Sequence, residues 1–238
     1  MSLLYNARVI EGLLLIDKPA GVSSFGVVSK VRGILRAHYG IKNIKVGHIG
    51  TLDPAATGLL VLAVGKYTKR VPELIKQDKT YQVTMCLGKT SSTGDKEGEI
   101  SQVSDMQPSV IDIEEALAQF TGDIMQTPPA FSAIKVNGQR AYKLARDGKA
   151  VVIEPRQVTI YANQFVSYNY PEVQFNSEVG SGTYIRSLVE DIGKQLGTGA
   201  YMSDLCRTKI GNFAIENAIP LDGLDYSKIT NHIQTLVN

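Results

Sequence analysis

The stretch GHIGTLDPAATGLL, from Gly47 to Leu60, places one carboxylate, Asp53, between a Gly/Thr-rich turn and a proline. The run Leu59–Val64 (LLVLAV) that follows is continuously apolar, which is typical of a strand buried on both faces. Asp53 therefore stands just before a core strand. Two interpretations follow: Asp53 caps a short helical turn that begins at Pro54 and ends at Gly58, or it is presented to a substrate.

Length and charge limit the possible functions. The chain has 238 residues, 43% of them hydrophobic, which supports one large domain or two small ones. Its net charge is only +2, but the charges gather in zones. Ser29–Lys45 holds five basic residues and no acid, Lys135–Arg156 six basic residues and two acids, and Asp95–Asp123 eight acids and one lysine. Basic zones suit a polyanion that docks in one orientation, although a solvated helix face explains each segment taken alone.

The cysteines and histidines give no sign of a metal site or a disulfide. Cys86 and Cys206 form no C-x-x-C pair, and the three histidines lack the spacing of metal ligands. The apolar run Leu13–Ile16 is too short for a signal peptide, and nothing approaches the length of a membrane span. We therefore expect a cytoplasmic protein that needs no metal and has no membrane partner.

Hydrophobic periodicity divides the chain into short strands and helices that mix without regular βαβ alternation. This mixture predicts an α+β fold with a mixed or largely antiparallel sheet. The predicted strands are Gly12–Asp17, Leu59–Val64, Tyr81–Leu87, Gln157–Tyr168 and Glu172–Val179. The predicted helices are one capped by Ser24, Ser109–Phe120, Arg140–Gly148, Thr183–Leu196 and Asn231–Val237, with a tight turn at Asn137-Gly138.

Several common chemistries lack their motifs. The sequence has no G-x-x-x-x-G-K-[ST] phosphate loop and no G-x-S-x-G nucleophile elbow. It also shows no pair of carboxylates of the kind glycosidases use. What remains is Asp53 in its distinctive setting, together with four other stretches of unusual composition.

Five long blocks closely resemble the TruB family of tRNA pseudouridine synthases and cover roughly residues 12 to 213 in the same order. The blocks are GLLLIDKPAGVSS, VGHIGTLDPAATGLLVLAVGKYTK, DKTYQV, TPPAFSAIKVNGQRAYKLARDG and GTYIRSLVEDIGKQLGTGAYMSDLCRTKIGNF. The resemblance implies a pseudouridine synthase fold: a curved mixed or antiparallel sheet with flanking helices and a central active-site cleft. It also implies the reaction, which converts the T-loop uridine at position 55 of tRNA to pseudouridine after that base is flipped out.

That chemistry needs few groups. The bond from N1 of the base to the ribose breaks, the base turns, and it rejoins the sugar through C5, so no atom enters or leaves. We therefore expect no cofactor. One carboxylate serves either as nucleophile toward the sugar or as base at the neighbouring ribose carbon, and the sequence leaves both routes open. By the resemblance, that carboxylate is Asp53.

The resemblance assigns partners to Asp53 around the flipped base. Arg186 would pair with the Asp53 carboxylate, with an exposed helix pair to Glu190 as the alternative. Tyr81 would stack on the target base, with an ordinary core tyrosine as the alternative. Tyr184 and Leu205 would wall the pocket, a role compatible with simple core packing.

The resemblance also suggests roles for three further residues. His48 matches a histidine that contacts the RNA, and a loop histidine bonded to the backbone is the alternative. Lys18 would meet a phosphate or support the surroundings of Asp53, unless it is simply solvated. Asp95 would lie at the edge of the pocket, unless it is an ordinary charged loop residue.

The domain prediction follows the same resemblance. Residues 1–213 form the catalytic domain, with a mobile thumb-like insertion at 128–156 that closes on the T-arm of tRNA. Residues 214–238 form a short tail rather than a full RNA-binding domain of the PUA type, and no obligate protein partner is implied. Two rival functions stay open: a non-catalytic RNA-binding or tRNA-folding protein of the same fold, and a sugar-processing hydrolase with a second carboxylate.

Overall fold

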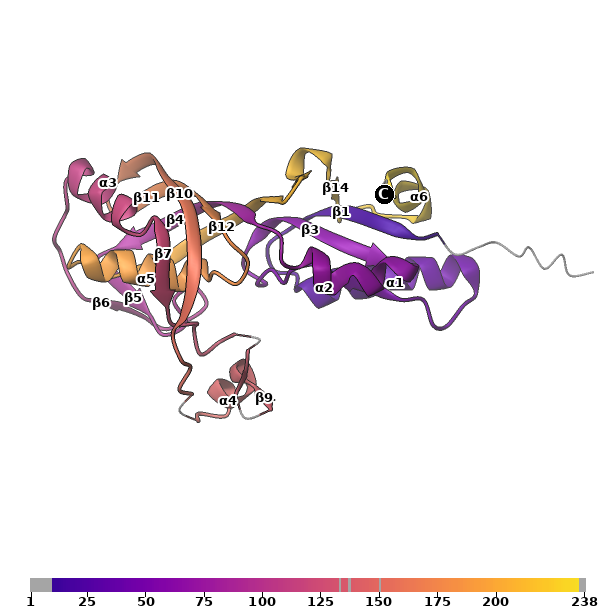
Figure 1. Ribbon diagram of the computed structural model, residues 1–238, viewed down its shortest axis with the longest axis horizontal. Helices are drawn as coiled ribbons and strands as arrows, with labels where there is room; N and C mark the ends of the chain where they lie inside the picture. Colours follow the sequence, from indigo (N-terminus) through magenta and orange to yellow (C-terminus); the bar gives the residue numbers. More distant parts are fainter. Residues whose placement is uncertain (1–9, 133, 137, 150, 236–238) are drawn as a thin grey trace, which may run out of the picture. The chain divides into compact units, whose positions relative to one another are not determined.

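The chain forms two compact units, which are described separately. The computed structural model describes residues 10–132, 134–136, 138–149 and 151–235. Unit 1 comprises residues 1–77 and 206–238, and unit 2 comprises residues 78–205. Figure 1 labels most of the helices and strands of both.

Unit 1 is built around β3, the strand that carries the LLVLAV run. β1 pairs antiparallel with the whole of β3, β2 pairs antiparallel with its last residues, and the end of β12 pairs parallel with its first residues. β13 and β14 pair with β12 and β1. The strands are β1 (Gly12–Lys18), β2 (Val46–His48), β3 (Thr57–Val64), β12 (Ala200–Ile210), β13 (Phe213–Ala214) and β14 (Ile219–Pro220).

Hydrophobic side chains cover both faces of this sheet, which is why β3 reads as an uninterrupted apolar run. On one face Leu60 and Leu62 pack with Val31 and Leu35 of α1. On the other face the alternate residues of β1 and β3 pack against Leu74 of α2. The helical elements are α1 (Ser24–Tyr39), η1 (Gly65–Arg70), α2 (Val71–Leu74), η2 (Ile215–Asn217) and α6 (Tyr226–His232).

Two helix boundaries in unit 1 correct the sequence prediction. The N-cap of α1 is Ser23, whose hydroxyl accepts a bond from the Gly26 N–H at 3.0 Å. The helix predicted at Asn231–Val237 is wrong, because the observed helix α6 starts after its cap Asp225 and ends at His232. Residues 236–238 lie outside the described part of the chain.

Unit 2 is a sheet in the order β12-β4-β11-β10-β7, in which β4, β11, β10 and β7 pair antiparallel. Helices α3 and α5 contact each other, and they pack on β10 and β4 respectively. The strands are β4 (Lys79–Leu87), β5 (Lys89–Ser91), β6 (Ile100–Gln102), β7 (Gly122–Gln126), β8 (Lys135–Val136), β9 (Gln139–Arg140), β10 (Arg156–Asn169) and β11 (Glu172–Val179). The helices are α3 (Val110–Gln119), α4 (Ala141–Arg146) and α5 (Ile185–Gln195).

The insertion at 128–156 leaves the end of β7 and returns at the start of β10. Its small hairpin, β8 with β9, leads into α4, and these elements protrude from the sheet of unit 2 (Figure 1). Gly148 follows α4 with a left-handed φ of +69°, as predicted for the end of that helix. Asn137, the first residue of the predicted tight turn, lies outside the described residues.

The predicted fold class is confirmed: the sheet combines parallel and antiparallel pairs, with helices packed against it. β12 was not predicted, and it is the strand that runs through both units. No helix among the described residues is long and apolar enough to cross a membrane.

Candidate active site

Asp53 lies in the loop between β2 and β3, where it begins a four-residue turn. Its carbonyl accepts a bond from the Ala56 N–H at 3.2 Å, and Pro54 supplies the fixed φ that suits the second position of the turn. The interpretation of Asp53 as a helix cap is therefore wrong. Gly58 ends no helix either: it lies in β3 with φ +98°, where a Cβ would meet the Arg207 carbonyl at 2.4 Å.

Lys18 holds this turn from the end of β1. Its side chain is fully buried, and Nζ donates to the carbonyls of Pro19, Val22 and Pro54 at 2.9, 2.8 and 3.2 Å. The Gly21 N–H also donates to the Pro54 carbonyl, at 2.8 Å. A solvated lysine is thus excluded, and of the two predicted functions the structure supports the one in which Lys18 stabilises the surroundings of Asp53.

Arg207 of β12 holds the other side of the loop and was missed by the sequence analysis. Its guanidinium is buried and donates to the carbonyls of Gly50, Thr51 and Leu59, at 3.0, 3.2 and 2.9 Å. An arginine fork can bind three acceptors at once, because its donors diverge in one plane. The sequence hint was that Arg207 stands in the segment CRTKI, in which less polar residues alternate with charged ones. The spacing alone does not show what Arg207 binds.

A third contact fixes the residue before Asp53. The hydroxyl of Ser24, at the first position of α1, donates to the Leu52 carbonyl and accepts from the Leu52 N–H, both at 2.8 Å. Ser24 therefore joins α1 to the loop instead of capping the helix. Together, Lys18, Ser24 and Arg207 hold the backbone on both sides of Asp53, so the carboxylate is presented from a rigid loop.

His48, at the end of β2, bonds to the backbone of the same loop. Its Nδ1 accepts from the Gly50 N–H at 3.4 Å. Burial, reinforced by the nearby Arg207 cation, lowers the pKa of His48 below its ordinary value. The structure thus shows the backbone-bonded histidine of the alternative interpretation, and RNA contact stays a prediction.

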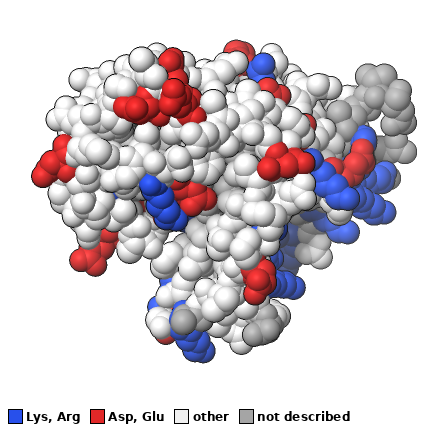
Figure 2. Space-filling model, turned by 60° about the vertical axis from the view of Figure 1, so that its left-hand side comes forward, with Lys and Arg blue, Asp and Glu red and all other residues white. Residues whose placement is uncertain are grey.

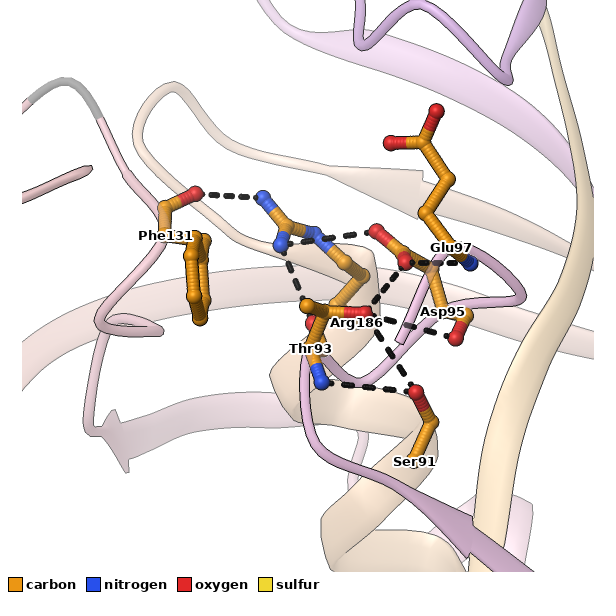
Figure 3. A network of polar contacts seen from close by, with 6 residues as sticks. All are labelled: Ser91, Thr93, Asp95, Glu97, Phe131 and Arg186. Carbon is orange, nitrogen blue, oxygen red and sulfur yellow. Dashed lines mark hydrogen bonds and ion pairs between the residues drawn. The ribbon is translucent and has the colours of Figure 1, made fainter. Parts of the chain in front are cut away.

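Unit 2 contains a second buried cluster, centred on Arg186 of α5 (Figure 3). The guanidinium lies 3.5 Å from Oδ2 of Asp95, and both side chains are under 10% exposed. It also donates to the carbonyls of Thr93 and Phe131, at 3.1 and 2.9 Å. Arg186 is therefore not an exposed helix residue, so the surface pair with Glu190 is ruled out as its main role.

Asp95 is equally well held. Its Oδ1 accepts from the Thr93 hydroxyl at 2.6 Å and from the Glu97 N–H at 3.0 Å, as Figure 3 shows. Asp95 is therefore a buried, hydrogen-bonded loop residue, and its place at the edge of the pocket stays a prediction. Because Phe131 belongs to the insertion, the same arginine joins the Thr93–Asp95 loop to the base of the thumb.

The predicted stacking residue Tyr81 and the two predicted wall residues, Tyr184 and Leu205, also belong to unit 2. Tyr81 is 8% exposed in β4, on the strand face that also carries Val83 and Met85, and Leu205 is buried in β12. Tyr184 is half-buried at the start of α5, with the Arg156 guanidinium 5.4 Å from the centre of its ring. Side-chain burial fits both a core role and a pocket wall for these residues.

Gln126 is a positioning residue that the sequence did not reveal. Its buried amide accepts from the Tyr184 N–H at 2.8 Å and donates to the Tyr184 carbonyl at 3.1 Å. This two-point contact fixes the backbone that carries the Tyr184 ring. A lone glutamine at the end of a strand gives no pattern from which such a contact can be read.

The predicted site residues divide between the units. Lys18, His48 and Asp53 lie in unit 1, whereas Tyr81, Asp95, Tyr184, Arg186 and Leu205 lie in unit 2. Within units, the structure joins Lys18 to the Asp53 turn and Asp95 to Arg186. Pairing between Asp53 and Arg186 stays a prediction. Within the described ranges, no group of three His, Cys, Asp or Glu side chains is placed to hold a metal ion.

Sequence comparisons match nearly the whole chain. The model of the N-terminal domain of TruB family pseudouridylate synthases matches residues 36–185, and that of the tRNA pseudouridylate synthase B C-terminal domain matches residues 186–235. tRNA pseudouridine synthase B of Burkholderia lata is 43% identical over 91% of this chain and 66% of its own length. The enzyme of the same name from Clostridium acetobutylicum is 44% identical over 94% of this chain and 75% of its own length.

Solved structures agree with the sequence matches. A chain in the crystal structure of a Cbf5-Nop10-Gar1 complex superposes with a TM-score of 0.71 at 30% identity, covering 94% of this chain and 60% of that one. A chain of an H/ACA RNP bound to a substrate RNA containing 2'-deoxyuridine gives a TM-score of 0.65 at 29% identity, covering 88% and 51%. The chain thus spans about two thirds or more of the curated relatives and roughly half of these structural neighbours.

Proposed function

Because the chain belongs to the TruB family of pseudouridylate synthases, we propose that it isomerises a uridine of transfer RNA to pseudouridine. The target is the T-loop uridine at position 55, and the T-arm stem-loop is the partner. The named activity of the 43–44% identical relatives supports this proposal. A cytoplasmic location would follow from that substrate, and no protein partner is required.

Asp53 is the catalytic residue in this proposal. It acts once the uridine is flipped out of its loop, either attacking the sugar or removing a proton from the neighbouring ribose carbon. In either route the N1–ribose bond breaks and a C5–ribose bond forms, so the products balance without a cofactor. Water must be kept out during this step, because its attack on the sugar would leave an abasic site.

The observation that carries the proposal is the support of the Asp53 loop. Lys18, Ser24 and Arg207 are all buried, and each bonds the backbone within three residues of Asp53. Burying three polar side chains to hold one short turn is costly unless the position of that turn matters. A carboxylate that must meet one ribose atom has such a requirement.

Unit 2 supplies the remaining groups that we propose contact the base. Tyr81 stacks on the uracil, Tyr184 and Leu205 wall it, and Arg186 pairs with the Asp53 carboxylate and orients it. Asp95 holds Arg186 in place, which the 3.5 Å ion pair supports. The insertion at 128–156 closes on the T-arm. His48 contacts the RNA, and Lys18 stabilises the surroundings of Asp53.

Tritium release tests this function. Unmodified transcript tRNA containing 5-tritiated uridine loses tritium when the ribose replaces hydrogen at C5. We expect release by the wild-type protein and none by Asp53→Asn, which should still bind the tRNA. Release by Asp53→Asn at the wild-type rate would remove Asp53 from the mechanism, and binding without release by the wild type would favour a non-catalytic RNA-binding protein.

Mass spectrometry separates isomerisation from hydrolysis. Pseudouridine leaves the mass of the tRNA unchanged, whereas a hydrolase acting at the same bond would release uracil and leave an abasic product. An abasic or cleaved product from the wild-type protein would overturn the proposal.

A further inference from the structure

The two units carry opposite net charges, and the positive charge is on the unit that presents Asp53. Residues 1–77 and 206–238 contain 14 Lys and Arg against 7 Asp and Glu, a net charge of +7, whereas residues 78–205 contain 11 against 16, a net charge of −5. Figure 2 shows a face on which acidic side chains form several separate clusters. A polyanion would therefore be drawn to unit 1, and not to the chain as a whole.

Within unit 1, four basic side chains gather where α1 lies beside β2. This basic strip consists of Arg32, Arg36, Lys42 and Lys45. Arg32 reaches from α1 to the Val46 carbonyl, with its guanidinium 2.9 Å from that oxygen, so the third turn of the helix lies directly beside the residue that follows Lys45. Arg36 is one helical turn further along, on the same side as Arg32.

The loop that carries the two lysines is held in place. Gly40 ends α1 in the left-handed conformation, and Ile44 is buried in the core under the helix. The Lys45 carbonyl accepts from the Gly65 N–H at 2.9 Å. These contacts fix the backbone at Gly40, Ile44 and Lys45, which reduces the backbone entropy lost when this loop binds a ligand.

Three side chains of the strip are available for a partner. Arg36, Lys42 and Lys45 are exposed, and within the described ranges none of the three side chains forms a hydrogen bond or an ion pair. The stretch from Ser29 to Lys45 contains no acid that could neutralise them. Repulsion among such charges costs stability, and an anionic ligand would remove that cost.

Both elements of the strip lead to the Asp53 loop. Ser24, at the N-terminal end of α1, bonds Leu52, and His48, at the C-terminal end of β2, bonds Gly50. Eight residues of helix separate Ser24 from Arg32, which is roughly 12 Å at 1.5 Å per residue. Phe25, 67% exposed, lies on the same flank as Arg32 and Arg36, beside the end that meets the loop.

We propose that the basic strip binds the phosphate backbone of the substrate RNA outside the nucleotide that reacts. RNA binding commonly joins a row of cations along the backbone with an exposed aromatic ring on which an unpaired base stacks, and the strip with Phe25 has both. The strip sets affinity and orientation, whereas Asp53 and the base-contacting residues perform the reaction. This inference rests on the proposed function for the identity of the RNA.

The salt dependence of tRNA binding tests the strip. The variant Arg36→Gln/Lys42→Gln/Lys45→Gln removes three charges whose side chains bond nothing in the described chain, so the fold should be retained. Each lost phosphate contact should lower the slope of log K against log salt by about 0.7–0.9, or roughly 2 for two to three contacts. We expect at least tenfold weaker binding of unmodified tRNA at low salt, with kcat at saturating tRNA unchanged.

A matched control removes charge from unit 2. Lys96 and Lys194 are exposed, and each already lies beside a carboxylate, Asp204 at 3.7 Å and Asp191 at 3.1 Å. Lys96→Gln/Lys194→Gln should leave both the slope and the affinity at wild-type values. Phe25→Ala should weaken binding without changing the slope, because stacking involves no counterion.

The outcomes separate the strip from the proposed function. A strip variant with wild-type slope and affinity overturns the strip, and normal tritium release would leave the function standing. If the control variant weakened tRNA binding equally, the strip would also be overturned, because binding would then depend on the total charge of the protein. A smaller salt slope in the strip variant, together with no tritium release by the wild-type protein, would support the strip and reject the proposed function.

Discussion

Buried cations hold the backbone near Asp53 in unit 1 and near Asp95 in unit 2, but they do so with different partners. In unit 1, Lys18 and Arg207 donate to six backbone carbonyls from three segments of the chain: the loop after β1, the Asp53 loop and β3. In unit 2, Arg186 donates to two carbonyls and also forms an ion pair with Asp95. The first arrangement fixes a loop, whereas the second joins a charge pair to the insertion at 128–156.

The two arrangements differ in the group that loses its partner when the cation is removed by mutation. A carbonyl that loses a buried donor stays neutral, so the cost is that of an unmet hydrogen bond. Asp95 without Arg186 would keep a buried negative charge, which the chain can avoid by binding a proton. Mutation of the cations in unit 1 should therefore displace the loop that their hydrogen bonds hold. Mutation of the pair in unit 2 should instead leave a buried charge without its partner.

The largest effect should come from Arg207. Arg207→Met removes three charge-assisted bonds of roughly 1.5–3 kcal/mol each, so we expect the free energy of unfolding to fall by at least about 4 kcal/mol. Arg207→Lys keeps the charge but has no fork, and it should lose less stability while still lowering kcat through a displaced loop. Urea denaturation and tritium release measure the two quantities. Wild-type stability in Arg207→Met would show that the three bonds fix nothing.

The second effect should come from the pair in unit 2. Asp95→Asn leaves the Arg186 cation without its buried carboxylate, and we expect a loss of about 3 kcal/mol at neutral pH. Adding Arg186→Met should cost less than the two single changes together, with a coupling energy of about 1–3 kcal/mol. A double-mutant cycle by urea denaturation at pH 7 measures this coupling. Strictly additive losses would contradict the ion pair as the main contact.

Proteolysis distinguishes the two functions of Arg186. Arg186 bonds the Phe131 carbonyl directly, whereas Asp95 acts on it only through Arg186, so Arg186→Met should speed cleavage within residues 128–156 more than Asp95→Asn does. Equal cleavage rates in both variants would mean that Asp95 holds the thumb as well.

The sequence predicted the elements that have a strong local pattern. Glu172–Val179 alternates apolar and polar residues and forms β11 with those bounds. The helix at Ser109 has a capping box with Asp112, and α3 starts there as expected. Leu59–Val64 forms most of β3, because a run buried on both faces has few alternatives.

The features that the sequence did not predict, strand β12 and the partners of the buried cations, depend on tertiary contacts. β12 contains Asp204, Arg207 and Lys209, so its pattern does not read as a strand, and only pairing with β3 and β4 explains it. For the site, motifs located Asp53, Lys18 and Arg186, and the resemblance offered either a phosphate or the surroundings of Asp53 as the partner of Lys18. The structure gives Lys18 and Arg207 to backbone carbonyls, which no spacing along the chain reveals.

Two adjacent serines separate fold stability from loop position. Ser24→Ala leaves the N–H and carbonyl of Leu52 without their buried partner, so we expect a loss of about 2 kcal/mol and a lower kcat. Ser23→Ala removes only the cap of α1, at about 1 kcal/mol, and should leave kcat unchanged. Thermal unfolding and tritium release at saturating tRNA measure both. Equal kcat in the two variants would mean that α1 does not position the Asp53 loop.

The smallest effect should be the pH dependence that His48 contributes. Its pKa is lowered in the folded chain, first by burial and then by Arg207, so the unfolded chain binds the proton more readily. The stability that neutral His48 provides is complete above pH 6.5 and declines as the pH falls below it, by at most about 1.4 kcal/mol per pH unit. His48→Gln should flatten this decline in urea titrations between pH 7 and pH 5. Because Arg207 is one of the two causes, NMR titration of Arg207→Met should show the pKa of His48 closer to its ordinary value. An unmoved pKa in that variant would mean that burial alone keeps the ring neutral, and that the guanidinium acts on the loop only through its hydrogen bonds.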